Sequence, residues 1–296
     1  MDTEKCRALF EILKCGSFSA AAKRMGYTPS GLSRMVASME EDAGFPLLQR
    51  SRGGVKATRE CEKMLSVYKE FVAVDEKYKQ LAAEINGFET GTVVVGTAYS
   101  IYYKWLSGII RDFKRKYPNI EVTIIDGKST ELYKKMSVHE LDFAIVSKRD
   151  GNVSWRHLFD DSLVAIVSKD SSCAKQGNFP IELFKTEPYI ETFPGQDTDN
   201  SRMFMDNNLV PNIQFATEDT YASYRMVEAG LGVSLSNYIE SKERIFGENV
   251  CMVELNPPQI VEIGIVTPID EVISPAARKF RDFAISYIGD IKCLNT

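Results

Sequence analysis

The first forty residues carry apolar positions at helical spacing, and glycines interrupt them at regular points. Residues 9–13 form an apolar stripe that Gly16 ends, and residues 20–25 (AAAKRM) form a short second stretch that Gly26 closes. Ser17 or Ser19 can cap this second stretch. The pattern predicts two short helices joined by a tight turn, with a third helix after them.

The third predicted helix has strong start signals. Thr28 is a favourable N-cap, and Pro29 stands at the first helical position, where its missing N–H costs nothing. Its apolar face carries Leu32, Met35, Val36 and Met39. Its polar face carries Ser30, Ser33, Arg34 and Ser38. Short polar side chains and an arginine opposite a buried stripe suit the major groove of duplex DNA. A three-helix bundle with a solvated face is the alternative for this pattern alone.

Residues 45–58 (FPLLQRSRGGVKAT) predict a strand, a tight turn and a second strand. Gly53-Gly54 supplies the turn, and Arg50, Arg52 and Lys56 cluster around it with no acidic residue between them. A basic hairpin after a helix-turn-helix is typical of a wing, which meets the phosphate backbone or the minor groove. A solvated loop is the alternative.

The segment from residue 58 to about residue 88 contains no proline and many charged residues. Leu65, Val72, Leu81 and Ile85 lie among them, which predicts one amphipathic helix of roughly 30 residues. A monomer would leave such an apolar stripe exposed to water, so the pattern predicts a homodimer.

Beyond residue 90, strand and helix patterns alternate. The predicted strands are residues 92–97, 121–125, 142–146, 163–167, 213–215 and 233–235. The predicted helices are residues 103–117, 131–138 and 222–228. This alternation indicates α/β layers. Two such units joined by crossing segments form a cleft between lobes, where small molecules commonly bind.

Charge is divided unevenly along the 296 residues. Residues 1–59 hold ten Lys or Arg and six Asp or Glu, whereas residues 60–296 hold twenty-six and thirty-five, although the whole chain has a net charge of −5. A basic segment on an acidic body favours one surface that faces nucleic acid.

The sequence offers no pattern for metal or enzyme chemistry. Its six cysteines form no C-x-x-C pair and only two histidines accompany them, which excludes a structural zinc site. No G-x-S-x-G, G-x-x-x-x-G-K or G-x-G-x-x-G motif is present. We therefore expect neither enzyme activity nor a cofactor. The start does not resemble a signal peptide and no apolar run is long enough for a membrane span, so we expect a cytoplasmic protein.

Residues 16–58 resemble the DNA-binding domain of the LysR-type transcriptional regulators. The matching positions are Ser17-Phe18, Ala21-Ala22, Leu32-Ser33-Arg34, Glu40, Gly44, Leu47, Arg50, Arg52 and Thr58. LDFAIVS at 141–147 and VEAGLGVSL at 227–235 resemble landmarks of that family's effector domain. His139 replaces a glycine that the family often has at a helix end, and histidine tolerates the left-handed turn that this position requires.

The resemblance implies a fold and a set of partners. It implies a winged helix-turn-helix at 1–58, a dimerising linker helix at 59–89 and a two-lobed α/β effector domain, like the periplasmic binding proteins, at 90–296. Lobe I would comprise 90–162 and 268–296, and lobe II 163–267. The implied function is regulation of transcription by a homodimer or homotetramer on double-stranded DNA, with contact to RNA polymerase and a small-molecule effector, a carboxylate or an aromatic acid, between the lobes.

The resemblance also assigns candidate site residues. The DNA-contacting set is Thr28, Pro29, Ser30, Ser33 and Arg34, with Arg50, Arg52 and Lys56 in the wing. The effector-contacting set is Tyr99, Ser100, Ile101, Ser129, Thr130, Ser147, Thr192, Phe193 and Thr220. An aromatic lining of the cleft would draw on Tyr99, Tyr102, Tyr103, Trp105, Phe193, Tyr221 and Tyr224, for each of which core packing is the alternative.

One position departs from the family pattern. Members usually carry Gln-Pro-Ala after the turn, whereas this chain has Pro29-Ser30-Gly31. The glutamine amide that bonds adenine is absent, and Gly31 lowers helix stability by about 0.5–1 kcal/mol relative to alanine. The operator sequence is therefore expected to differ from the family's usual one.

Two other functions remain as alternatives. A thiol-based sensor on the same scaffold would use Cys173 and Cys251. A solute-binding protein would account for the two lobes, but it would leave residues 1–88 without a role.

Overall fold

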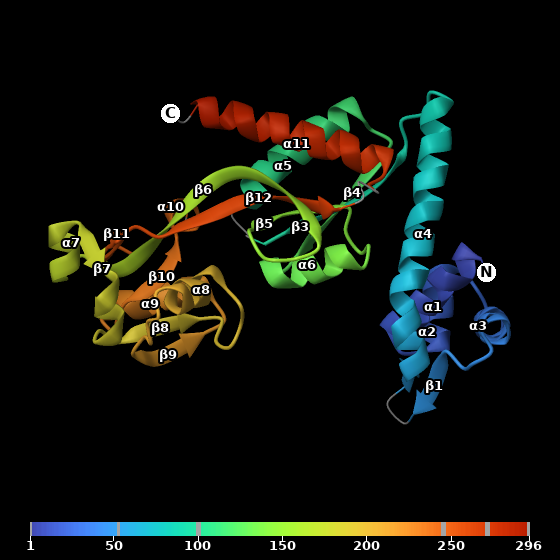
Figure 1. The fold of residues 1–296 in the computed structure, drawn as a ribbon, viewed down its shortest axis with the longest axis horizontal. Coiled ribbons are helices and arrows are strands. Elements are labelled where there is room, and N and C mark those ends of the chain that lie inside the picture. The colour runs from blue at the N-terminus through green and yellow to red at the C-terminus, as the bar shows by residue number, and fades with distance from the viewer. Residues whose placement is uncertain (1, 52–53, 99–101, 244–246, 270–272, 295–296) are drawn as a thin grey trace.

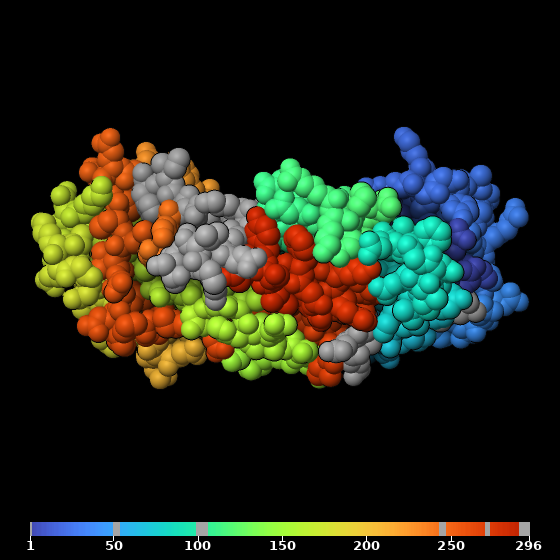
Figure 2. Space-filling model, turned by 90° about the horizontal axis from the view of Figure 1, so that it is seen from above, coloured from blue at the N-terminus to red at the C-terminus, as the bar shows by residue number. Residues whose placement is uncertain are grey.

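The computed structural model describes residues 2–51, 54–98, 102–243, 247–269 and 273–294. Within these ranges, the side chains of residues 50, 51, 102–105, 243 and 290–294 are not part of the description. The chain is elongated, with the N-terminal domain at one end and the two lobes of the C-terminal domain towards the other (Figures 1 and 2). No helix in the described ranges has the length and apolar character needed to cross a membrane.

The N-terminal domain contains three helices and a hairpin. Its elements are α1 (Thr3–Cys15), α2 (Phe18–Met25), α3 (Pro29–Ala43), β1 (Leu48–Ser51) and β2 (Gly54–Ala57). The expected left-handed glycines end the first two helices, since φ is 63° at Gly16 and 71° at Gly26. Two apolar clusters join the helices, one of them centred on Ile12, Ala22 and Leu32. The three predicted helices and the hairpin are therefore present.

Helix α4 (Arg59–Ile85) connects the two domains over 27 residues. Its N-cap is Thr58, whose hydroxyl oxygen accepts from the Cys61 N–H at 3.0 Å. Its first half packs on the N-terminal domain, where Leu65 and Val72 join the core around Tyr68. Two of the four apolar residues predicted to face a partner chain therefore face their own domain instead.

The C-terminal domain alternates strands and helices as predicted. Its strands are β3 (Gly91–Thr97), β4 (Ile120–Asp126), β5 (Phe143–Ser147), β6 (Val153–Ser168), β7 (Asn178–Pro180), β8 (Tyr189–Thr192), β9 (Ile213–Thr217), β10 (Ser234–Asn237), β11 (Val250–Asn256) and β12 (Ile260–Pro268). Its helices are α5 (Tyr102–Lys116), α6 (Ser129–Ser137), α7 (Ser172–Gln176), the 3₁₀ helix η1 (Ile181–Lys185), α8 (Asp199–Asp206), α9 (Thr220–Glu228), α10 (Tyr238–Glu243) and α11 (Pro275–Leu294).

Two long strands run through both lobes. The main sheet has the order β4-β3-β5-β12-β6-β11-β7, and β10 pairs with β6 from the side. The antiparallel strands β6 and β12 pair from Val153 opposite Pro268 to Ser162 opposite Ile260. The expected lobe boundaries at 162/163 and 267/268 fall within these two strands. The lobes are therefore joined by continuous β-structure (Figure 1).

Each lobe has its own apolar core. In lobe I, α5 and α11 cover one face of the sheet and α6 the other (Figure 1), and the rings of Phe113 and Phe280 meet edge to face at 4.8 Å. In lobe II, Phe184 packs against Tyr189 and Phe204 at 5.4 and 5.1 Å. Separate cores allow the lobes to act as two rigid parts around the cleft that lies between them.

Candidate functional site

The start of α3 is built by local capping. The Thr28 hydroxyl oxygen accepts from the Gly31 N–H at 3.1 Å, and Pro29 occupies the first turn. A β-carbon at position 31 would lie 3.1 Å from the same hydroxyl oxygen, so glycine leaves room for the cap. Leu32, Val36 and Met39 are buried beneath the helix. The opposite face is thereby held outward in a fixed orientation.

The outward face of α3 contains the predicted recognition residues. Thr28, Pro29, Ser30 and Arg34 are exposed, and Ser33 is half-buried. Within the described part of the chain, the Arg34 guanidinium makes no hydrogen bond or ion pair, so its donors are available to a partner. Ser38 differs from these residues, because its hydroxyl accepts from Lys5 Nζ at 2.8 Å and belongs to the fold.

The hairpin β1–β2 is anchored to the helices at two points. The Glu40 carboxylate accepts from the Leu47 N–H at 2.7 Å, and the Val55 N–H donates to the Gly16 carbonyl at 2.8 Å. Gly54 is required where the hairpin passes this turn, because its φ is 105° and a β-carbon there would lie 2.7 Å from the Gly16 oxygen. The hairpin is thus fixed beside α3.

The structure describes the side chain of only one of the three basic residues of the hairpin. Lys56 lies in β2 and is exposed. Arg50 lies in β1, but its side chain is outside the described part, and Arg52 is outside it altogether. The surface formed by the exposed face of α3 and by Lys56 is called the DNA-facing surface below.

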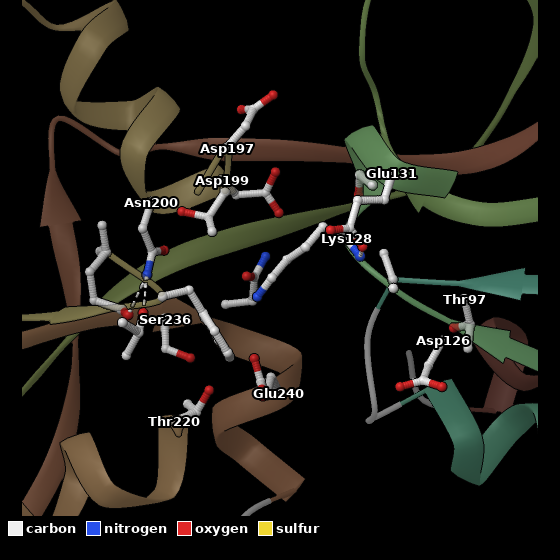
Figure 3. A pocket seen from close by; sticks show the side chains of 18 of the residues that line it. Thr97, Asp126, Lys128, Glu131, Asp197, Asp199, Asn200, Thr220, Ser236 and Glu240 are labelled. Carbon is white, nitrogen blue, oxygen red and sulfur yellow. Dashed lines mark hydrogen bonds between the residues drawn. The ribbon is translucent and has the colours of Figure 1, made fainter. Parts of the chain in front are cut away.

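A second candidate site lies between the lobes, in a cavity of about 360 Å³. Its lining comes from the ends of β3, β4, β8 and β10 and from the starts of α6, α8, α9 and α10 (Figure 3). The polar lining residues are Thr97, Asp126, Lys128, Ser129, Glu131, Arg149, Thr192, Asp197, Thr198, Asp199, Asn200, Thr220, Ser236, Asn237 and Glu240. Strand ends that face helix starts are a common place for a ligand in α/β proteins.

The predicted effector residues fall into three groups. Four of them line the cavity: Ser129, Thr192, Phe193 and Thr220. Thr130 and Ser147 lie just behind the lining, where the Thr130 hydroxyl donates to Asp197 at 2.6 Å and the Ser147 hydroxyl lies 2.9 Å from that of Ser129. Tyr99, Ser100 and Ile101 are outside the described residues.

The described residues do not give the cavity an aromatic wall. Tyr224 is buried in lobe II, where its hydroxyl donates to Ser236 at 2.9 Å, and Tyr221 is 49% exposed away from the lining. The side chains of Tyr102, Tyr103 and Trp105 are outside the description. Phe193 is the one aromatic residue among the described lining residues. The suggestion of Tyr221 and Tyr224 as lining residues was wrong.

Charged residues that sequence reasoning missed dominate the lining. Lys128 precedes α6 on lobe I, and its ammonium lies 3.0 Å from the centroid of the Phe193 ring on lobe II. Arg149, which follows β5, donates from Nη2 to Asp199 Oδ1 at 2.7 Å. Together with the Thr130–Asp197 hydrogen bond, these contacts tie lobe I to lobe II across the cavity.

Burial shifts the pKa values of the charged residues that connect the two lobes. The side chains of Arg149 and Asp199 are only 6% and 5% exposed. Burial raises the pKa of Asp199 to about 7, and it lowers the pKa of Arg149 to about 10. The neighbouring Asp197 behaves in the opposite way, because hydrogen bonds from Arg202 lower its pKa to about 2. Asp197 therefore carries charge at every physiological pH.

Family models match both parts of the chain. "Bacterial regulatory helix-turn-helix protein, lysR family" matches residues 3–62, and "LysR substrate binding domain" matches residues 86–288. The chain belongs to the LysR family of transcriptional regulators. The expected fold, a helix-turn-helix with a long helix and an α/β effector domain, is confirmed.

Relatives and solved structures agree with this LysR assignment over the full length. The HTH-type transcriptional regulator YvbU of Bacillus subtilis is 23% identical over 98% of this chain and 99% of its own. A cysteine-to-aspartate variant of full-length OxyR from Pseudomonas aeruginosa has a TM-score of 0.73 at 18% identity, with 97% of each chain covered. Full-length CbnR in complex with its target DNA has a TM-score of 0.64 at 15% identity, covering 98% of this chain and 99% of CbnR.

Membership of the LysR family decides between the functions considered from the sequence. The family consists of DNA-binding transcription regulators, so the chain is a regulator and neither an enzyme nor a solute-binding protein. The thiol-sensor variant finds no support in the geometry. Cys173 is buried, and burial raises the pKa of the Cys251 thiol, which disfavours its reactive thiolate form.

Two aspartates outside the cleft, the half-buried Asp142 and the buried Asp161, make the effector domain sensitive to pH. Burial raises the pKa values of Asp142 and Asp161 to about 6, while each carboxylate accepts a backbone N–H, from Val94 at 2.7 Å and from Ile239 at 3.2 Å. A raised carboxyl pKa means that the folded protein holds its proton more tightly than the unfolded chain does. The stability that these two groups contribute therefore falls as pH rises from about 4 to about 6–7, and Asp199, with a pKa of about 7, adds a further fall above that range.

We predict that the melting temperature rises by a few degrees when pH is lowered from 7.5 to 5.5. Each aspartate contributes about 1 kcal/mol over this interval. Scanning calorimetry across pH measures the effect. The double variant Asp142→Asn, Asp161→Asn keeps both acceptors and should reduce this rise to the part that Asp199 contributes. A wild-type melting temperature that falls towards pH 5.5 would contradict the prediction.

Proposed function

We propose that a small molecule bound in the cavity between the lobes controls how this LysR regulator engages DNA. The observation that carries the proposal is the set of contacts across the cavity, Lys128 to Phe193, Thr130 to Asp197 and Arg149 to Asp199. A ligand in this cavity meets both lobes at once. If the ligand binds one arrangement of the lobes more tightly than another, it increases the population of the arrangement that it prefers.

Contacts between lobe I and α4 support a route from this cavity to DNA. Gln80 on α4 is 5% exposed, and its amide donates to the Thr92 carbonyl at 3.4 Å and accepts from the Ala276 N–H at 3.3 Å. Lys69 on α4 pairs with Glu140 of lobe I at 2.6 Å. Any movement of lobe I thus acts on the helix that carries the DNA-binding domain.

The two parts of the DNA-facing surface support different kinds of contact with DNA. In this proposal Thr28, Pro29, Ser30, Ser33 and Arg34 enter the major groove, with Arg34 as the long donor to base edges. Arg50, Arg52 and Lys56 meet phosphates or the minor groove. The domain limits 1–58, 59–89 and 90–296 belong to the same proposal.

The exposed part of α4 supports a dimer. Val67, Val74, Tyr78, Leu81 and Ile85 are all exposed, with Tyr78 at 71% and Ile85 at 78%. Their spacing of seven, four, three and four residues is that of a coiled-coil seam. This exposed seam differs from the stripe predicted from the sequence, which it shares only at Leu81 and Ile85. We propose that a second copy covers it, and that such dimers form tetramers, contact RNA polymerase and act in the cytoplasm.

Charges placed in this seam should separate the protomers. We predict that the double variant Leu81→Asp, Ile85→Asp weakens dimerisation at least 100-fold, because the interface would have to bury four carboxylates without partners. Sedimentation equilibrium at micromolar concentration measures the mass. Ser66→Asp adds a charge at an exposed position outside the seam and should leave the dimer intact. A double variant of unchanged mass would show that the seam is not the interface.

The experiment that tests ligand control compares footprints with and without a ligand. Binding sites are first selected from random duplex DNA by the full-length protein, and ligands by a thermal-shift screen of the same protein. A ligand at 100 times its dissociation constant adds about 2.7 kcal/mol of stability. The proposal requires that such a ligand changes the affinity or the extent of the footprint. Ligands that stabilise the protein and leave DNA binding unchanged would contradict it.

A further inference from the structure

The cavity between the lobes contains buried hydrogen-bond donors that have no acceptor. Among the described residues, Arg149 Nε and Asn237 Nδ2 are the buried side-chain nitrogens without a hydrogen-bond partner. Both residues line the cavity, Asn237 is 6% exposed, and the side chain of Arg149 is 6% exposed. The Asn237 amide lies near the Asp161 carboxylate, but it does not reach hydrogen-bond geometry. A buried donor without an acceptor is costly, which points to an acceptor on a ligand.

Lys128 adds a cation that forms no ion pair with a carboxylate of the described residues. The cations of the described lining are Lys128 and Arg149, and Arg149 is already paired with Asp199. The ammonium of Lys128 rests on the Phe193 ring and makes no ion pair within the described residues. Figure 3 shows Lys128 reaching from lobe I into the space between the lobes. A ligand carboxylate would therefore find a charged partner and an amide donor in the lining of the same cavity.

The mouth of the same cavity is acidic. Asp126 ends β4 and Glu131 lies in α6 on lobe I, while Glu240 lies in α10 on lobe II. Figure 3 shows Asp126 on the side of lobe I and Glu240 on the side of lobe II. These carboxylates repel a ligand whose only charge is negative. They attract an ammonium, which Lys128 alone would in turn repel.

From these opposed charges we infer that the effector is a small zwitterion of the α-amino acid class. Its carboxylate contacts Lys128 and Asn237, and its ammonium faces Asp126. The remaining lining, including Ala98, Phe193 and Leu235, receives an uncharged side chain. This inference rests on the proposed role of the cavity as the effector site, and it replaces the carboxylate or aromatic acid expected from the sequence.

The test uses the full-length protein and matched compounds. The twenty proteinogenic L-amino acids are screened by thermal shift at pH 7.5, and the strongest is compared by calorimetry with its desamino carboxylic acid and its decarboxylated amine. We expect at least one amino acid to bind, and each analogue to bind at least tenfold more weakly. The inference is overturned if either analogue binds as tightly as the amino acid, or if none of the twenty binds.

Variants connect that binding to the cavity. Lys128→Met should lower the affinity for the amino acid at least tenfold, whereas the affinity for its matched amine should not fall. The control Lys134→Met removes an exposed lysine of α6, the helix that follows Lys128, and should change neither affinity. The variant Asp126→Asn should lower the affinity for the amino acid and reduce the ratio of that affinity to the affinity for the desamino acid. Full affinity for the amino acid in folded Lys128→Met would overturn the inference.

The results of these experiments distinguish a failure of the proposed ligand class from a failure of the proposed function. Suppose that a carboxylic acid binds as tightly as the amino acid and changes the DNA footprint. This result would refute the zwitterionic ligand but support the cavity as the effector site. Suppose instead that an amino acid binds through Lys128 and leaves the footprint unchanged. This result would support the zwitterionic ligand but refute ligand control of DNA binding.

Discussion

Replacing Arg34 with alanine should abolish sequence-specific DNA binding while leaving the protein folded. Arg34 is exposed on α3 and is the long side-chain donor on the proposed recognition face, since Pro29-Ser30-Gly31 supplies no glutamine amide. A bidentate hydrogen bond from arginine to a base is worth about 1–3 kcal/mol. A dimer makes this interaction twice, so we expect its removal to lower affinity for the selected site at least about 30-fold.

The matched control for Arg34 is Lys56→Ala in the hairpin. It removes an exposed cation of the same surface that we assign to phosphate. Lys56→Ala should weaken binding to all duplexes about equally, and lower the slope of log affinity against log salt by about one for each phosphate that is no longer neutralised. Competition binding with selected and random duplexes distinguishes the two effects. An Arg34→Ala protein that keeps its preference for the selected site would refute α3 as the reading element.

Replacing Arg149 with methionine should strongly destabilise the effector domain. The change leaves Asp199 buried without its partner, and removing one member of a buried ion pair costs about 3–5 kcal/mol. For a domain of this size the melting temperature should fall by roughly 6–20 °C. The loss should be smaller at pH 5.5 than at pH 8, because burial raises the pKa of Asp199 and a protonated carboxyl group tolerates the apolar surroundings.

The double variant Arg149→Met, Asp199→Leu tests this explanation directly. It removes the stranded carboxylate as well as the guanidinium, and apolar replacements of buried ion pairs are often neutral or stabilising. The double variant should therefore regain most of the lost stability. A single variant as stable as the wild type, or a double variant no better than the single, would show that the pair is not what holds this part of the cleft.

The N-terminal domain was predictable because its signals are local. Thr28, Pro29 and the glycines at 16 and 26 specify caps and ends within a few residues, and each appears in the structure as predicted. His139 is a similar case, since the expected left-handed turn has φ of 56°. Such features depend on backbone geometry that neighbouring residues determine, so tertiary packing rarely overrides them.

The seam of α4 shows where local pattern becomes insufficient. Leu65 and Val72 follow the same helical spacing as Val67 and Val74, so periodicity alone favours neither pair. The N-terminal domain decides, because it buries Leu65 and Val72 and leaves Val67 and Val74 exposed. A helix that serves two interfaces therefore needs its partners to be known before its faces can be assigned.

The cleft was the least predictable part of the molecule. Lys128, Arg149 and Asp199 lie in separate segments, and each resembles a solvated surface residue in its own sequence context. Arg149 and Asp199 meet only because the segment after β5 and the start of α8 are brought together from different lobes, and Lys128 lines the same cavity. The hydroxyl residues Ser129, Thr192 and Thr220 were named because the resemblance to the LysR family assigns these positions, whereas a long-range charge pair leaves no local signal in the sequence.

Ligand control of DNA binding can be measured most directly on one selected operator. Affinity and footprint are recorded for the wild type and for Lys128→Met as the strongest ligand of the thermal-shift screen is titrated. Coupling between two sites usually amounts to about 1–3 kcal/mol, so we expect at least a fivefold change in wild-type affinity or a shifted footprint, and no response in Lys128→Met. A saturating ligand that stabilises the wild type and changes neither affinity nor footprint would contradict control from the cleft.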